Sequence, residues 1–147
     1  MRVEMPNWAA MAVQITGRAA ALDAATRAGL ETVAMLAERA VVDQLTLRSH
    51  PPGTPTPSAP GQPPALITGD LAGSVAHHGP TGAAGRYEVV VGATTVYARI
   101  QELGGRTGAG HRTVLPPRPY LHPALLAAQR DMLAVMIRAW RAAMMGA

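Results

Sequence analysis

The sequence predicts an α+β fold, in which a long N-terminal helix and a C-terminal helix pack on a small antiparallel sheet, with a short helix between strands. Residues 19–47 and 122–145 repeat apolar side chains every three or four positions, as amphipathic helices do. Between them lies the β-branched run 87–91, which is typical of a strand. A chain of 147 residues is expected to form a single domain, residues 1–147.

The N-terminal helical tract is expected over residues 8–48, after a lead-in or short strand at residues 1–6. Asn7 is a suitable N-cap, because its side-chain oxygen can accept a backbone N–H of the first turn. Thr16-Gly17 is expected to kink or break the helix. One apolar face carries Leu30, Val33, Ala37, Ala40 and Val41. A helix this long cannot bury both ends against so small a domain, so part of it is expected to pack on another subunit.

Opposite charges four residues apart are expected to pair along this helix, Asp23 with Arg27 and Arg27 with Glu31. Each such pair contributes roughly a few tenths of a kcal/mol. Gly29 is expected to cost the helix about 1 kcal/mol relative to alanine.

Residues 49–64 form a segment with seven prolines. Proline lacks the backbone N–H and fixes φ, so this segment is neither a helix nor a central strand but an extended, polyproline-like loop. Two interpretations stay open. The segment is a disordered connector, or it is an arm that lies over a neighbouring subunit, because pre-stiffened chain loses little entropy on docking. The sheet and its short helices are expected within residues 65–118.

A hairpin follows this segment. Residues 68–74 suggest one helical turn, residues 75–78 a strand, and residues 79–85 a turn rich in glycine and proline. The second strand is the run 87–91, ended by Gly92. Two strands alone are only marginally stable, so a third strand or a helix is needed over the apolar face of the hairpin.

The stretch from residue 97 to 125 is predicted to be a joint between the sheet and the last helix. Thr95 is expected to cap a short helix that starts near Val96 and stops at Gly104. A flexible polar loop is expected over residues 106–114. Residues 114–118 are expected to be an edge strand and the third strand of the sheet, because their prolines exclude a central position.

The last helix is expected at residues 122–145, with His122 at the cap, Pro123 at the first helical position and Gly146 after the end. The stripe expected to lie in the core comprises Leu126, Leu133, Ile137, Trp140 and Met144. Another face carries Arg130, Arg138 and Arg141. This basic face is a candidate contact for DNA phosphates; the alternative is a solvated helix surface.

Residue types needed for catalysis are scarce. The chain has no Cys and no Lys, which excludes disulfides, thiolate chemistry, Schiff bases and a Walker-type phosphate loop. The five histidines show no metal-binding spacing, and the adjacent His77 and His78 should point to opposite faces of a strand. The net charge of +4 permits contact with a polyanion without requiring it. We therefore expect no enzyme, no cofactor and no metal site.

The N-terminus lacks the sustained apolar stretch of a signal peptide. No run approaches the roughly 18 apolar residues that cross a membrane. The chain is therefore expected to work inside a cell, or inside something assembled there.

Three motifs occur in order between the two long helices: PPA-x-x-TG-x-L-x-x-S, YA-x-x-x-E-x-G and RPYL-x-PAL, with a strand ending in Val-Gly after the first. In this order the chain resembles the neck, or tail-completion, proteins of long-tailed bacteriophages, also described as minor tail or head–tail joining proteins. The matching residues are Pro64, Thr68, Gly69, Leu71, Ser74, Tyr97, Ala98, Glu102, Gly104, Arg118, Pro119, Tyr120, Leu121, Pro123, Ala124 and Leu125. The chain departs from the pattern in its proline-rich insert and in Tyr120, where phenylalanine is frequent.

The resemblance implies a structural virion protein that forms a homo-oligomeric ring, expected to be a hexamer, and joins the DNA-filled head to the tail. Its partners would be copies of itself and the adjacent head-completion (connector) and tail-terminator proteins, with DNA in the lumen as a further candidate and no membrane. Its expected place is the head–tail junction of the virion, after assembly in the host cytoplasm. The alternatives are a tail terminator that caps the tail tube, a small Arg-rich DNA-binding module, and a small enzyme of unknown type.

The residues expected to form an assembly joint are Tyr97, Glu102, Gly104, Arg118, Pro119, Tyr120 and Pro123. Glu102 and Arg118 are expected to pair within or between subunits. Tyr120 is expected to anchor the joint in the core, with its hydroxyl near the surface.

Overall fold

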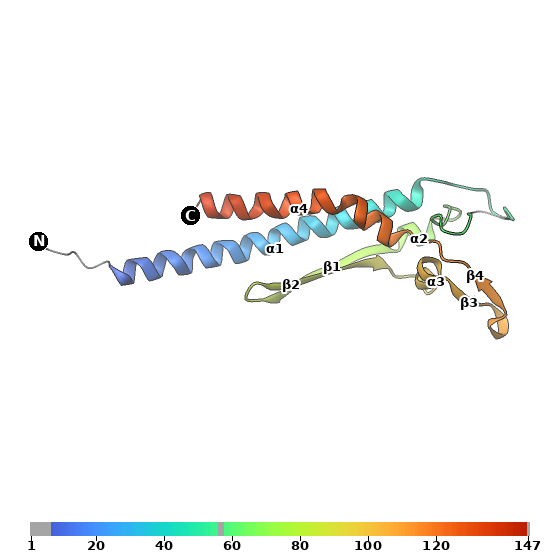
Figure 1. The fold of residues 1–147 in the computed structure, drawn as a ribbon, viewed down its shortest axis with the longest axis horizontal. Helices are drawn as coiled ribbons and strands as arrows, with labels where there is room; N and C mark the ends of the chain where they lie inside the picture. The colour runs from blue at the N-terminus through green and yellow to red at the C-terminus, as the bar shows by residue number, and fades with distance from the viewer. Residues whose placement is uncertain (1–6, 56–57, 147) are drawn as a thin grey trace, which may run out of the picture.

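The computed structural model describes residues 7–55 and 58–146, and it is α+β, as the sequence predicts. Its elongated body has three layers, with α1 (Trp8–Thr46) in the middle (Figure 1). On one side α4 (Leu121–Met145) runs antiparallel to α1; on the other lies the hairpin of β1 (Val75–Ala83) and β2 (Arg86–Ala93). The short elements are α2 (Asp70–Gly73), α3 (Ala98–Leu103), β3 (Gly105–Thr107), the 3-10 turn η1 (Ala109–His111) and β4 (Thr113–Leu115).

Helix α1 is a single uninterrupted helix. The side chain of Asn7 accepts the N–H of Ala10 at 3.2 Å, so the predicted N-cap is confirmed. The predicted break at Thr16-Gly17 is wrong. The Thr16 hydroxyl donates to carbonyls one turn earlier, which satisfies it inside the helix, and an isolated glycine is tolerated there. The predicted lead-in at residues 1–6 lies outside the described residues.

The contact between α1 and α4 depends on small residues. Gly29 is buried, and a Cβ at this position would lie 2.9 Å from Sδ of Met136 and 3.3 Å from Cβ of Ala139. Nearby, the indole N–H of Trp140 donates to the hydroxyl of Thr26 at 2.9 Å. Gly29 therefore lets the two helices approach closely, which offsets its unfavourable helix propensity.

We expect Gly29→Leu to lower the free energy of unfolding by about 2 kcal/mol, because added side-chain volume at a packed contact forces neighbouring atoms to shift. The matched control is Gly17→Ala on the same helix, where nothing lies within 4 Å of the new methyl group. That change should be neutral or should raise stability by up to about 1 kcal/mol. Urea unfolding followed by circular dichroism measures both, and equal effects would contradict the close helix contact.

The hairpin turn is shorter than predicted. The expected turn at residues 79–85 reduces to Ala84 and Gly85, both with positive φ (53° and 77°), as in the two-residue turns that suit the twist of a hairpin. Gly79 and Pro80 instead lie within β1, where the pairing register shifts at a bulge. The bulge lets β1 continue beyond the point where glycine and proline predicted its end.

Helix α1 covers the hairpin through side chains that were expected to pair along the helix. Asp23 accepts the hydroxyl of Tyr87 at 2.6 Å and the backbone N–H of Gly85 at 3.1 Å. Arg27 donates to the same hydroxyl at 3.2 Å, with its guanidinium carbon 5.1 Å from the centre of the Tyr87 ring. Neither predicted ion pair, Asp23–Arg27 or Arg27–Glu31, forms, because these groups bind the hairpin instead.

His77 joins β1 to α1 between two carboxylates. Its Nδ1 lies 2.6 Å from a carboxylate oxygen of Glu38, and its Nε2 lies 3.5 Å from one of Glu31. The hydrogen bond to Glu38, with the interaction with Glu31, raises the pKa of His77 above its ordinary value. His78 is exposed on the other face of the strand, as the alternation of side chains predicts.

Because the pKa of His77 is raised by folding, its stabilising contribution should be fully present below about pH 6.5, the pKa in the unfolded chain, and should disappear as the pH rises through the folded pKa. The difference in urea midpoint between wild type and His77→Gln is expected to shrink between pH 5.5 and pH 8.5. His78→Gln is the matched control and should follow the wild-type profile. A difference that stays constant with pH would contradict stabilisation by a charged His77 between Glu31 and Glu38.

The predicted third strand is wrong. β4 pairs only with β3, in a second two-stranded sheet, among the residues that the structure describes. Pro116 and Pro117 follow β4 directly and cannot extend the ladder, since proline has no N–H to donate. The segment expected to be a flexible loop, residues 106–114, contributes to this second hairpin and to the turn η1.

The stripe of α4 that was predicted to be core is largely exposed. Leu126, Leu133, Trp140 and Met144 are 61, 57, 38 and 56% exposed, and Ile137 is half-buried. Helix α4 instead turns another face inward, on which Ala124 is buried in the core and Met136 and Ala139 lie against Gly29. The end of α4 before Gly146 agrees with the prediction.

The proline-rich segment lies against its own chain. Residues 49 and 66 form a parallel bridge, and the N–H of Gly61 donates to the carbonyl of Pro117 at 2.9 Å. Ser58 is buried, and its hydroxyl oxygen accepts the N–H of Ala65 at 2.9 Å. In its described part the segment is therefore held against the residues that lead into α4, and its contact with a neighbouring subunit stays a prediction.

Candidate assembly joint

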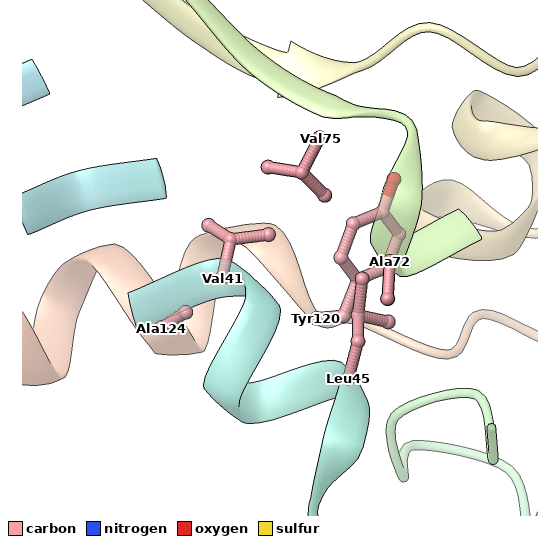
Figure 2. Packing of buried hydrophobic residues seen from close by; sticks show 6 residues of the cluster. All are labelled: Val41, Leu45, Ala72, Val75, Tyr120 and Ala124. Carbon is pink, nitrogen blue, oxygen red and sulfur yellow. The ribbon is translucent and has the colours of Figure 1, made fainter. Parts of the chain in front are cut away.

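The core of the molecule lies where α1, α2, β1 and the start of α4 meet. Figure 2 shows the ring of Tyr120 among aliphatic side chains from these elements. The buried cluster consists of Val41, Leu45, Ala72, Val75, Tyr120 and Ala124. Three segments that are distant in the sequence are thus fixed to one another at this point.

Glu102, on α3, caps the N-terminus of α4. One carboxylate oxygen accepts the backbone N–H of Tyr120 at 2.7 Å and that of Leu121 at 2.9 Å; the other accepts the N–H of His122 at 3.1 Å. A negative charge is also favourable at this end of a helix, where the free N–H groups carry partial positive charge. Glu102 therefore caps a helix that begins 19 positions later in the sequence, at Leu121.

The cap leaves no free donor in the first turn of α4. The first four N–H groups of a helix have no partner within it. Here Glu102 binds three of them, and the fourth position is Pro123, which has no N–H. Pro123 is the third helical residue rather than the first, because α4 begins at Leu121 with Tyr120 in the cap position.

Glu102 and Arg118 do not pair within the described chain. The carboxylate of Glu102 is occupied by the helix cap, and the buried Nε of Arg118 has no hydrogen-bond partner among the described residues. The backbone N–H of Arg118 donates to the carbonyl of Gln101 at 2.8 Å. Pro119 follows and is half-buried. Arg118 is therefore held to α3 by a backbone hydrogen bond to Gln101, the residue before Glu102, and not by an ion pair with Glu102.

Tyr120 anchors the joint, as the sequence predicts, but its hydroxyl is not near the surface. The residue is 2% exposed, and its hydroxyl donates to the buried carbonyl of Ala98 at 3.5 Å. Burial, together with the negative charge of Glu102, raises the pKa of the Tyr120 hydroxyl. The side chain is held inside the joint over its whole length.

Gly104 ends α3, as predicted, and its conformation excludes other residues. Its φ is +69°, and a Cβ there would lie 2.7 Å from the backbone N of Pro117 and 2.8 Å from the carbonyl oxygen of Leu115. Both contacts are with backbone, which cannot move aside as a flexible side chain can. Gly104 therefore lets the segment that leads to α4 pass close to the end of α3.

Tyr97 occupies the N-cap position of α3, so the predicted cap by Thr95 is wrong. The backbone carbonyl of Thr95, and not its hydroxyl, accepts the N–H of Ala98 at 3.0 Å. Tyr97 is 38% exposed and lines an open pocket of about 250 Å³, together with Leu45 and Gln101. Of the expected joint residues, Tyr97 alone presents a large side chain to this pocket.

The basic face of α4 is exposed at all three positions, Arg130, Arg138 and Arg141. Part of the long N-terminal helix was expected to pack on another subunit, but which part was not predicted; in the structure every residue from 8 to 20 is exposed. The composition of residues 8–20 could have indicated a contact surface, since this stretch is mostly apolar and Arg18 is its one charged residue.

No family model matches the chain, and neither the curated proteins nor the solved structures include a significant match to it. Within the described ranges, no helix is both long enough and apolar enough to cross a membrane. In the same ranges no three His or acidic side chains come together as a metal site would require.

Proposed function

We propose that the chain is a structural virion protein of the neck, or tail-completion, type, which forms a ring at the head–tail junction of a long-tailed bacteriophage and joins head to tail. Its partners are copies of itself, the adjacent head-completion and tail-terminator proteins, and DNA in the lumen. The proposal treats the chain as a scaffold and assigns it no reaction.

The observation that carries the proposal is the convergence of the three motifs. The first contributes Leu71, which packs against the buried cluster, and the third contributes Tyr120 and Ala124 to the cluster itself. The second contributes Glu102, which caps the helix that the third motif begins, and Ala98, whose carbonyl accepts from Tyr120. Motifs that fix one another in this way are constrained as a set, which supports a resemblance based on their order.

Exposed apolar surface supports a role in assembly. Large apolar side chains are exposed on both long helices, among them Trp8, Ile15, Leu126 and Leu133. Trp8 and Ile15 are seven residues apart, as are Leu126 and Leu133, so each pair lies on one face of its helix. Apolar surface gathered on one face marks interaction surfaces.

Deleting the gene from its phage and imaging the products by negative-stain microscopy tests the proposal. We expect DNA-filled heads and separate, unjoined tails, with normal virions restored by the wild-type gene supplied in trans. Normal virions from the deletion would contradict a joining role. Tails of abnormal length would instead indicate a tail terminator, because a protein that caps the tail tube limits its growth.

A DNA-binding module is the second candidate, favoured by the exposure of Arg130, Arg138 and Arg141 on α4. It predicts duplex binding that weakens steeply with salt, because phosphate contacts release counterions. Replacing all three arginines with alanine should then flatten the salt dependence. Duplex binding that is absent at low salt would remove this candidate.

A further inference from the structure

The first part of α1 extends past everything that packs on the rest of it. Trp140 of α4 lies beside Thr26, and the tip of the hairpin lies beside Asp23. Helix α4 runs antiparallel and ends five residues after Trp140, so it reaches only to about residue 21 of α1. Residues 8–20, here called the α1 projection, continue for roughly 20 Å beyond both partners (Figure 1).

The α1 projection has the composition of a buried helix. Trp8, Met11 and Ile15 repeat at three and four positions, and they are 64, 43 and 61% exposed. The α1 projection continues a helix that is already nucleated, but most helices in proteins are stabilised by packing of their apolar face. Covering the exposed side chains of the α1 projection with a partner surface would therefore add stability.

A matching surface lies on the same chain. The outer stripe of α4, defined as Leu126, Leu133, Ile137, Trp140 and Met144, has spacings of seven, four, three and four. These are the spacings at which two helices pack side by side with interlocking side chains, and the α1 projection shows them too. Trp140 forms the inner edge of the outer stripe, because its indole N–H donates to Thr26 of the same chain while the residue stays 38% exposed.

Trp8, Met11 and Ile15 and the five residues of the outer stripe are uncharged. Arg130, four residues after Leu126 and three before Leu133, lies on the same side of α4, and its long side chain can keep the guanidinium in water beside the contact.

We propose that the α1 projection of one copy packs along the outer stripe of α4 in the next copy. A two-fold pairing of projections would cover α1 and leave the outer stripe in water. A head-to-tail contact covers both surfaces of every copy, and repetition of such a contact closes a ring or builds a filament. The inference rests on the proposed ring-forming function and specifies the contact between its subunits.

The area available is sufficient for a specific contact. Seven of the eight large apolar side chains on the two surfaces are 38–64% exposed and Ile137 is half-buried, so on average each has roughly 100 Å² left to bury if a large side chain covers about 150–250 Å². The eight that meet at one junction thus supply roughly 800 Å², and the alanines and helix backbone between them bring the total close to the roughly 1,200 Å² at which specific interfaces begin.

Two substitutions that each add a negative charge test the contact, with assembly of the full chain measured by analytical ultracentrifugation. Ile15→Glu disrupts the α1 projection, and Leu133→Glu disrupts the outer stripe. Each variant alone should stay monomeric at concentrations at least about tenfold above those at which the wild type assembles. The matched controls Ala10→Glu and Ala127→Glu add the same charge to exposed positions off the two stripes and should assemble like the wild type.

Mixing the two variants gives the decisive result. An Ile15→Glu copy keeps its outer stripe and a Leu133→Glu copy keeps its projection, so the mixture should form one-to-one dimers and nothing larger. The proposal is overturned if Leu133→Glu assembles like the wild type, if the mixture stays monomeric, or if the wild type itself never assembles. If the gene deletion gives normal virions but the mixture forms heterodimers, the proposed virion function is rejected and the proposed contact stands. If the deletion gives unjoined tails but both variants assemble like the wild type, the contact is rejected and the virion function stands.

Discussion

Tyr120→Ala is expected to lower the free energy of unfolding by about 3–5 kcal/mol, because truncating a large buried aromatic loses its transfer energy and leaves a cavity. Tyr120 is 2% exposed, and its ring contacts side chains from α1, α2 and β1. A domain of this size has about 5–15 kcal/mol of total stability. The variant should therefore be partly or wholly unfolded at 37 °C, as measured by urea and thermal unfolding.

Tyr120→Phe is the matched control, since it keeps the ring and removes only the hydroxyl. At 3.5 Å the hydrogen bond to the carbonyl of Ala98 is long for an O–H donor, so its loss should cost less than about 1 kcal/mol. A phenylalanine variant as unstable as the alanine variant would show that the hydroxyl, and not ring packing, holds the joint together.

The long helices and the hairpin were predictable because their signals are local. The apolar face of α1 recurs every three or four residues, and the structure buries Ala37 and Val41 of that face. Asn7 caps α1 as expected, since an N-cap acts within its own first turn. The alternation of side chains in a strand placed His77 and His78 on opposite faces.

The errors arose where a distant segment decides the outcome. Spacing alone suggested that Asp23 and Arg27 pair with each other, but Tyr87, some 60 residues away, binds both. The apolar stripe of α4 was assigned to the core, yet α4 turns a different face, which carries Ala124, Met136 and Ala139, toward α1. Periodicity reveals that a face is apolar and does not reveal what covers it.

The burial of Tyr120 was predicted correctly, but the role of Glu102 beside it was not. Glu102 and Arg118 carry opposite charges on neighbouring segments, which made an ion pair the natural expectation. The sequence does not show that three backbone N–H groups at the start of α4 reach Glu102 first. A proline early in a helix, with no capping side chain just before it, is the signal that a remote cap was needed.

Glu102→Ala is expected to lower the free energy of unfolding by about 3 kcal/mol. The carboxylate accepts three backbone N–H groups, and hydrogen bonds to a charged group contribute about 1.5–3 kcal/mol each when isolated. Glu102 is half-buried, so water replaces part of the loss. Glu88→Ala, which removes an exposed carboxylate, should change stability by no more than about 0.5 kcal/mol.

Glu102→Gln separates the geometry of the cap from its charge. The amide oxygen can still accept the N–H groups of Tyr120 and Leu121, whereas the amide nitrogen cannot accept that of His122. An intermediate loss of about 1–2 kcal/mol is therefore expected, with faster hydrogen exchange at His122 than at Leu121. If glutamine is as destabilising as alanine, the interaction is chiefly electrostatic; if alanine matches Glu88→Ala, Glu102 does not cap α4 in solution.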